Sequence, residues 1–196
     1  MKPLTLYLTL SFIFTSHYVA SADEKHSAIK PEPRSGGWIK RHESFNERVA
    51  KGNVDLLLIG DSITHGWEGK GKKIWEQYYT KRNAVNLGIG GDRTQHVIWR
   101  LDNGNIKGIS PKAAVVMIGT NNSGNNTPQE IADGLKVITE QLRVKLPKTK
   151  VLLLGIFPRG ENSKDKRRQV NEKANAIFKD LADEEYVHYL DIGKKF

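Results

Sequence analysis

The sequence contains no cysteine at all. This absence excludes disulfide scaffolds, cysteine-ligated zinc and iron–sulfur sites, and thiol catalysis. Internal repeats and low-complexity segments are also absent, which excludes repeat arrays. The composition that remains, with 38% hydrophobic and 27% charged residues in a chain of 196, is typical of one soluble globular domain. Any nucleophile in this protein must therefore be a side chain other than a thiol.

Long apolar runs are scarce, and the one that stands out lies at the N-terminus, from Leu4 to Phe14. Lys2 precedes it, and Ala20-Ser21-Ala22 forms a small-residue cleavage site, so the pattern predicts a secretory signal peptide over residues 1–22. Threonine and serine interrupt the run and no basic flank follows, which argues against stable membrane insertion. We therefore expect the mature chain to be secreted or periplasmic.

Positive charge is in excess, with 31 Lys+Arg against 22 Asp+Glu and a formal net charge of +9. Such a balance could attract an acidic polymer or an anionic surface. The basic residues are scattered, however, and aromatic residues are not interleaved with them as in nucleic-acid-binding segments. A solvated basic face is the preferred interpretation, and no nucleic-acid partner is predicted.

The pattern beyond the signal peptide predicts a polar linker over residues 23–37 and a single domain over residues 38–196. Five short apolar segments are of the kind buried in a parallel sheet. They are Val54 to Ile59, Ala84 to Ile89, Ala113 to Ile118, Val151 to Ile156 and Val187 to Ile192.

Helical patterns separate these segments. The clearest begins with the capping box Thr127-Pro128-Gln129-Glu130, and a second has apolar residues at helical spacing from Val170 to Leu181. Alternating strands and helices predict an α/β fold with right-handed crossovers, namely a three-layer α/β/α sandwich. Ligands of such sheets bind beyond the carboxyl ends of the strands.

Small and polar residues follow three of the predicted strands, at the point where each strand ends. The strands run into Gly60-Asp61-Ser62, Gly88-Ile89-Gly90-Gly91-Asp92 and Gly119-Thr120-Asn121-Asn122. A serine on such a turn can present its hydroxyl and its backbone N–H to a bound carbonyl. Glycine lets a ligand approach a backbone N–H, and asparagine adds an amide donor. One hydroxyl with several donors predicts an acyl-transfer site.

Each of these residues also has a plainer interpretation. Ser62 could simply cap the following helix. Asn121 could be an ordinary turn residue, and Asn121-Asn122-Ser123 matches a glycosylation sequon. Asp61 is expected to hold the turn through a hydrogen bond rather than to act as a catalytic acid.

The three clusters, in this order and each at a strand end, resemble the first three motif blocks of the SGNH (GDSL) hydrolases. Within that family, three segments resemble the catalytic subunits of platelet-activating-factor acetylhydrolase and their exported bacterial relatives. They are the run from Gly88 to Leu101, the Gly119-Thr120-Asn121-Asn122 turn and the segment from Leu154 to Gly160. The resemblance implies a flavodoxin-like sandwich with five parallel strands. It also implies that Ser62 is the nucleophile and that its N–H, the Gly91 N–H and the Asn121 side chain form an oxyanion hole.

The resemblance further implies an ester substrate, often an acetyl group on a lipid or a sugar, with no metal and no organic cofactor. Relatives that pair make a homodimer conceivable for this chain. Arg93 and Arg159 fall near strand ends, where they could contact an anionic or polar substrate.

One departure from the family pattern concerns the general base. In the family, an Asp-x-x-His block follows the fifth strand and precedes a final helix, whereas this sequence reaches Phe196 without such a block. We expect the base and its aspartate to lie beyond residue 196, so that the domain is C-terminally incomplete and the printed chain has little turnover. His65, His96 and His188 are not expected to replace the base, and Asp191 is expected to be structural.

Two other functions stay open at this point. The chain could be an inactive exported binding protein that holds an acylated glycan or lipid, or a thioesterase or acyltransferase that uses the same residues. If the final helix is absent, an apolar face of the sheet should be left exposed.

Overall fold

The computed structural model describes residues 25–195. The predicted signal peptide, residues 1–22, lies outside the described residues. The strands are β1 (Leu56–Gly60), β2 (Ala84–Gly88), β3 (Ala113–Met117), β4 (Lys150–Leu154) and β5 (Val187–Leu190). The α-helices are α1 (Gly37–Ala50), α2 (Ser62–His65), α3 (Lys72–Tyr78), α4 (Thr94–Asp102), α5 (Pro128–Lys145) and α6 (Lys166–Phe178). Short 3-10 turns are η1 (Ser27–Ile29), η2 (Gly66–Glu68), η3 (Thr80–Arg82), η4 (Lys179–Leu181) and η5 (Gly193–Lys195).

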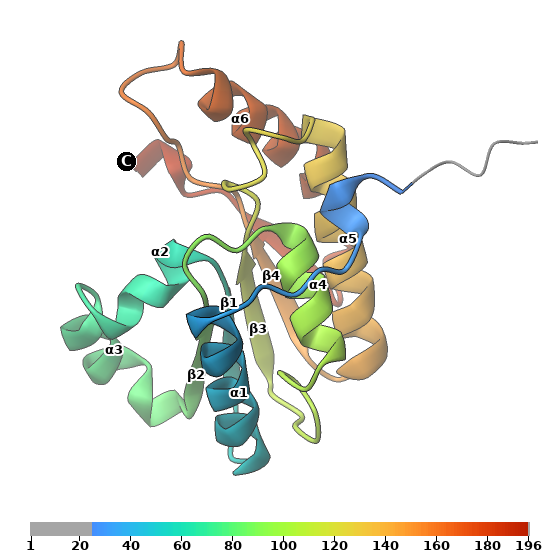
Figure 1. Ribbon diagram of the computed structural model, residues 1–196. Coiled ribbons are helices and arrows are strands. Elements are labelled where there is room, and N and C mark those ends of the chain that lie inside the picture. Colours follow the sequence, from blue (N-terminus) through green and yellow to red (C-terminus); the bar gives the residue numbers. More distant parts are fainter. Residues whose placement is uncertain (1–24, 196) are drawn as a thin grey trace, which may run out of the picture.

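The five strands form one parallel sheet in the order β2-β1-β3-β4-β5 (Figure 1). This arrangement confirms the predicted α/β fold and its five strands. In the register of the sheet, Gly60 pairs with Gly88 on one side and with Met117 on the other. The loops that follow β1, β2 and β3 therefore leave the sheet at the same level of the same edge.

One face of the sheet carries the main hydrophobic core. Leu57, Val116 and Leu153 project from this face and are completely buried, and residues of α1, α4, α5 and α6 belong to the same core. Each fully buried aliphatic side chain contributes about 1.5–3 kcal/mol relative to an exposed one. This packing fixes the sheet, and with it the edge from which the site loops extend.

The two predicted helices are confirmed, although α6 ends at Phe178 and Leu181 lies in the 3-10 turn η4. Capping residues explain where each helix begins. The Thr127 hydroxyl accepts a hydrogen bond from the Glu130 N–H, while the Glu130 carboxylate accepts one from the Thr127 N–H. This reciprocal capping box begins α5 at Pro128. Asp165 caps α6 in a similar way by accepting a hydrogen bond from the Arg168 N–H.

The other face of the sheet is less completely covered. Val115, Leu152 and Leu154 on this face are half-buried, and Leu190 on the outer strand is 47% exposed. Apolar side chains between α2, η2 and the sheet surround a cavity of about 430 Å³. None of the helices in the described part of the chain has the length and apolar character needed to cross a membrane.

The segment expected to be a linker packs on the domain in its described part. The Ala28 side chain is completely buried, and its carbonyl accepts a hydrogen bond from the Thr94 hydroxyl at 2.7 Å. His26 Nε2 lies 3.2 Å from the Asp133 carboxylate on α5, and the Glu32 N–H donates to the Gln95 carbonyl. Residues 26–32 are therefore part of the folded body, which the polar, proline-containing sequence did not reveal.

Candidate functional site

Ser62 lies where β1 passes into α2. Asp61 is the N-cap of that helix, and its Oδ1 accepts a hydrogen bond from the Ile63 N–H at 2.9 Å. The cap is thus Asp61 rather than Ser62, and the Ser62 side chain is exposed to solvent. The Ser62 N–H donates no hydrogen bond to another described residue, as is usual for the first N–H groups of a helix.

Asp61 is a buried carboxyl group, only 1% exposed. Burial raises the pKa of Asp61 from an ordinary value of 3.8 to about 6, and the nearby Asp92 carboxylate acts in the same direction. The Ile63 N–H and the Arg159 guanidinium lower the pKa and offset part of that rise. Asp61 therefore caps the turn, but its ionisation costs free energy in the folded protein.

The loop after β2 passes directly beside Ser62. A Cβ atom built on Gly90 would lie 3.8 Å from the Ser62 Cβ, so the backbone at residue 90 is adjacent to the serine side chain. Gly91 has φ +79°, and a Cβ there would lie 3.3 Å from Nη1 of Arg34. Both the backbone conformation and the space at this position favour glycine. The Gly91 N–H has no hydrogen-bond partner among the described residues.

A buried ion pair fixes the end of this loop. Arg100 on α4 is completely buried, and its Nε donates to Asp92 Oδ2 at 3.0 Å. The Trp38 indole donates to Asp92 Oδ1 at 2.6 Å, and Arg34 donates to the same oxygen at 3.3 Å. Burial raises the pKa of Asp92, and the Arg100 guanidinium opposes that rise. The carboxylate and its donors join α1 and α4 to the loop that carries Gly91.

Asn121 lies in the loop after β3 and contacts the loop after β2. Its Nδ2 donates to the Asp92 carbonyl at 2.9 Å, which leaves the second hydrogen of the same amide for a ligand. The neighbouring Asn122 is completely buried, and its Oδ1 accepts from the Thr94 N–H at 3.0 Å. Its Nδ2 donates to oxygens of Thr94, Gln95 and Asn126. This network places Asn121 at the sheet edge.

The structure thus brings the three predicted site residues to one edge of the sheet. Ser62 is adjacent to the loop that carries Gly91, and Asn121 is hydrogen-bonded to that same loop. Two backbone N–H groups and one amide hydrogen in this region lack a partner among the described residues. Donors of this kind, beside an exposed hydroxyl, suit the stabilisation of an oxyanion.

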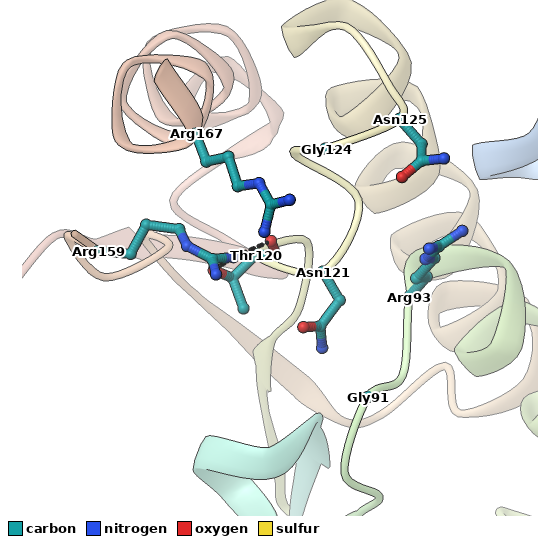
Figure 2. A pocket seen from close by; sticks show the side chains of 8 residues that line it. All are labelled: Gly91, Arg93, Thr120, Asn121, Gly124, Asn125, Arg159 and Arg167. Carbon is teal, nitrogen blue, oxygen red and sulfur yellow. Dashed lines mark hydrogen bonds between the residues drawn. The ribbon is translucent and has the colours of Figure 1, made fainter. Parts of the chain in front are cut away.

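A pocket of about 260 Å³ opens beside Gly91 and Asn121 (Figure 2). In Figure 2, Arg159 and Arg167 extend into it from one side, and Arg93 lies on the opposite side. Arg159 is oriented by a hydrogen bond from its Nη1 to the Thr120 carbonyl at 2.8 Å. The complete lining is Gly91, Arg93, Thr120, Asn121, Gly124, Asn125, Arg159 and Arg167.

The sequence indicated Arg93 and Arg159 at this site but missed Arg167 and Arg100. Arg167 belongs to the basic run Lys166-Arg167-Arg168, a pattern that is typical of a solvated surface. Arg100 follows the buried Val97 at a spacing of three residues. This helical spacing was the one sequence signal that could have predicted the burial of Arg100.

No histidine is hydrogen-bonded to the Ser62 hydroxyl within residues 25–195. His65 is nearest along the chain, but its Nδ1 lies 3.4 Å from the Gly90 nitrogen and accepts from that N–H. His96 is buried, and burial together with nearby arginines lowers its pKa to about 4, so it is neutral near pH 7. Its Nδ1 accepts from the Arg93 N–H, which is a structural contact.

The remaining candidates lie at the outer strand. His188 on β5 is 3.9 Å from the Glu184 carboxylate, and Asp191 accepts a hydrogen bond from the Gly193 N–H at 2.7 Å. Asp191 therefore has the structural contact expected of it. Within the described residues, no cluster of three or more histidine and acidic side chains could hold a metal ion.

Comparison with known proteins shows what this chain is similar to. Residues 58–196 match the model of the GDSL-like Lipase/Acylhydrolase family. The platelet-activating factor acetylhydrolase IB subunit alpha1 of Homo sapiens is 36% identical over 184 residues, covering 88% of this chain and 76% of that relative. The alpha2 subunit of Rattus norvegicus is 38% identical over 142 residues, covering 72% of this chain and 60% of that relative.

Solved structures share the fold at low sequence identity. A GDSL-like lipase from Bacteroides thetaiotaomicron superposes with a TM-score of 0.60 at 19% identity, covering 78% of this chain and 76% of that chain. A carbohydrate acetylesterase from Sinorhizobium meliloti also gives a TM-score of 0.60, at 18% identity, covering 72% of this chain and 85% of that chain. These matches support the sheet order and the helical layers described above.

Proposed function

Because this chain belongs to the GDSL-like lipase/acylhydrolase family, we propose that it is a serine-dependent hydrolase of carboxylic esters that carry an acetyl or another short acyl group. The relatives named above include acetylhydrolase subunits and a carbohydrate acetylesterase, which supports a short acyl group. A lipid or a carbohydrate supplies the alcohol part in this proposal.

The observation that carries the proposal is the set of donors without partners beside the Ser62 hydroxyl. The Ser62 oxygen attacks the ester carbonyl carbon, and the carbonyl oxygen becomes an oxyanion. That oxygen accepts hydrogen bonds from the Ser62 N–H, the Gly91 N–H and the Asn121 amide. Collapse of the intermediate breaks the bond to the alcohol and leaves an acyl-serine, which water then hydrolyses to the acid.

Attack by a serine hydroxyl needs a group that accepts its proton. We place this base outside the residues that the structure describes, because His65 and His96 already use their Nδ1 atoms as acceptors for backbone N–H groups. Loss of a triad histidine elsewhere cost about 10⁶ in kcat. Imidazole added in solution can accept the same proton, so Ser62-dependent hydrolysis can be tested with the 196-residue chain.

The test measures hydrolysis of p-nitrophenyl acetate with and without imidazole, after subtraction of the rate without protein. We expect imidazole to raise the protein-dependent rate, and we expect Ser62→Ala to abolish that rate. Ser163→Ala, at an exposed serine in the loop before α6, is the matched control and should behave as the unaltered protein does. Equal rates for Ser62→Ala and the control would overturn the proposal and favour the binding-protein alternative.

We also propose that residues 1–22 direct export of the chain. The apolar run and the Ala20-Ser21-Ala22 sequence support this proposal. The intact mass of the protein recovered from the bacterial periplasm should correspond to a chain that begins at Asp23. Recovery of the chain from the cytoplasm with Met1 still attached would contradict the proposal.

A further inference from the structure

The pocket beside the proposed oxyanion hole is unusually basic. Three of the side chains that line it are arginines, namely Arg93, Arg159 and Arg167, and none of its lining residues is acidic. The three come from separate segments: the start of α4, the loop after β4 and the first turn of α6. Folding therefore gathers them into one space of about 260 Å³ (Figure 2).

Within the described part of the chain these three arginines form no direct ion pair, although Arg159 is close enough to the Asp61 carboxyl to offset part of the rise that burial causes in its pKa. Among residues 25–195, no ion pair joins Arg93, Arg159 or Arg167 to a carboxylate. The nearby Asp92 is already paired with Arg100 and also accepts from Trp38 and Arg34. Like charges held together without a directly paired carboxylate repel one another, and a bound anion relieves that repulsion.

The local structure leaves room for the guanidinium groups. A Cβ atom on Gly124 would lie 3.4 Å from both Nε and Nη2 of Arg167, so the absence of a side chain there lets this group lie close to the backbone. The Arg167 guanidinium makes no hydrogen bond to any other described residue, whereas Arg159 uses only Nη1, on the carbonyl and hydroxyl oxygens of Thr120. Several N–H donors therefore remain for a ligand.

We propose that the substrate is an ester whose alcohol part carries a negatively charged group, which Arg93, Arg159 and Arg167 bind beside the oxyanion hole. This inference rests on the proposed function. An acetyl or other unsubstituted short acyl group carries no charge, so we assign the charge to the alcohol part. Phosphate, sulfate and carboxylate share the required chemistry, since each presents two or more oxygens to the planar guanidinium group. A neutral glycan would leave the three charges unmatched.

The first experiment measures binding, which does not depend on turnover. Isothermal titration calorimetry compares phenyl phosphate, phenyl sulfate and benzoate with the neutral benzyl alcohol. We expect at least one anion to bind saturably, and we expect Arg167→Gln and Arg93→Gln each to weaken that binding about 10- to 100-fold. Lys166→Gln removes the same charge from an exposed neighbouring position and should leave the affinity unchanged.

The second experiment uses turnover to link this pocket to the ester. It compares kcat/KM for 4-acetoxybenzoate with that for its neutral methyl ester, in the presence of imidazole. We expect the unaltered protein to prefer the anionic ester about 10-fold or more, mainly through KM, and Arg167→Gln to lose that preference. Lys166→Gln should keep it.

The two experiments separate failure of this inference from failure of the proposed function. Arginine-dependent binding of an anion, with hydrolysis that does not need Ser62, would overturn the proposed function and leave the anion site standing. Hydrolysis that needs Ser62, with neither an anion preference nor an effect of the arginine variants on anion binding, would overturn the inference alone. Equal weakening of binding by Lys166→Gln would also overturn it, because the effect would then come from overall charge.

Discussion

The buried Asp61 carboxyl gives a quantitative prediction for the dependence of stability on pH. Its pKa of about 6 in the folded protein, against 3.8 in an exposed carboxyl group, means that folding favours the protonated form. The difference of about two pKa units corresponds to about 3 kcal/mol, at 1.36 kcal/mol per unit. The native protein gains this relative stability below pH 4 and loses it as the pH rises through 6.

The substitution Asp61→Asn removes the ionisation and keeps the cap, because the asparagine oxygen can accept the hydrogen bond from the Ile63 N–H. We expect the free energy of unfolding of the variant, relative to the unaltered protein, to rise by about 3 kcal/mol between pH 4 and pH 8. The assay is urea denaturation followed by tryptophan fluorescence at several pH values. Glu161→Gln, at an exposed position in the loop before α6, is the control. A difference between variant and unaltered protein that stays constant across this pH range would refute the reasoning.

Three further predictions follow from the contacts around the site. Arg100→Met should lower the free energy of unfolding by about 3–5 kcal/mol, because the buried Asp92 would lose its completely buried cation and keep only the more exposed Arg34 at 3.3 Å. Denaturant unfolding would show this loss, and an effect no larger than that of Arg143→Gln at an exposed ion pair would contradict it. Thr127→Ala should lower the free energy of unfolding by about 1 kcal/mol through loss of the α5 cap, whereas Thr127→Ser should keep the stability of the unaltered protein. Equal free energies of unfolding for all three proteins in the same assay would disprove the capping argument. Asn121→Ala should lower the imidazole-supported kcat for p-nitrophenyl acetate about 10²- to 10³-fold, while Asn162→Ala, at an exposed position outside the pocket, serves as the control. A loss below tenfold would favour the turn interpretation of Asn121.

The fold could be predicted because its signals are local. The apolar strand segments are short and continuous, and the Thr127 to Glu130 capping box specifies the beginning of α5 without help from the rest of the chain. Parallel strands then require their carboxyl ends to share one edge. The pairing of Gly60 with both Gly88 and Met117 shows how closely the three loops are brought to one level.

The parts that could not be predicted depend on packing between distant segments. Arg100 is a charged residue on an otherwise ordinary amphipathic helix, and its burial makes sense only once Asp92, from another loop, is placed beside it. Arg167 lies in a basic run, and its side chain reaches the pocket because the start of α6 lies beside Gly124. Residues 26–32 lack an apolar pattern, yet the buried Ala28, its hydrogen bond from the Thr94 hydroxyl and the contact of the His26 side chain with Asp133 hold them against α4 and α5.

The proposed reaction requires the Ser62 hydroxyl and the Asn121 amide to act on the same carbonyl group, the hydroxyl on its carbon and the amide on its oxygen. An alkyl fluorophosphonate tests this requirement, because a reactive serine oxygen displaces its fluoride and the phosphoryl oxygen then occupies the oxyanion hole. With imidazole present, mass spectrometry of peptides should locate the adduct on Ser62, and Asn121→Ala should slow its formation at least tenfold. An adduct on another residue, or a labelling rate that the Asn121 substitution leaves unchanged, would contradict the account.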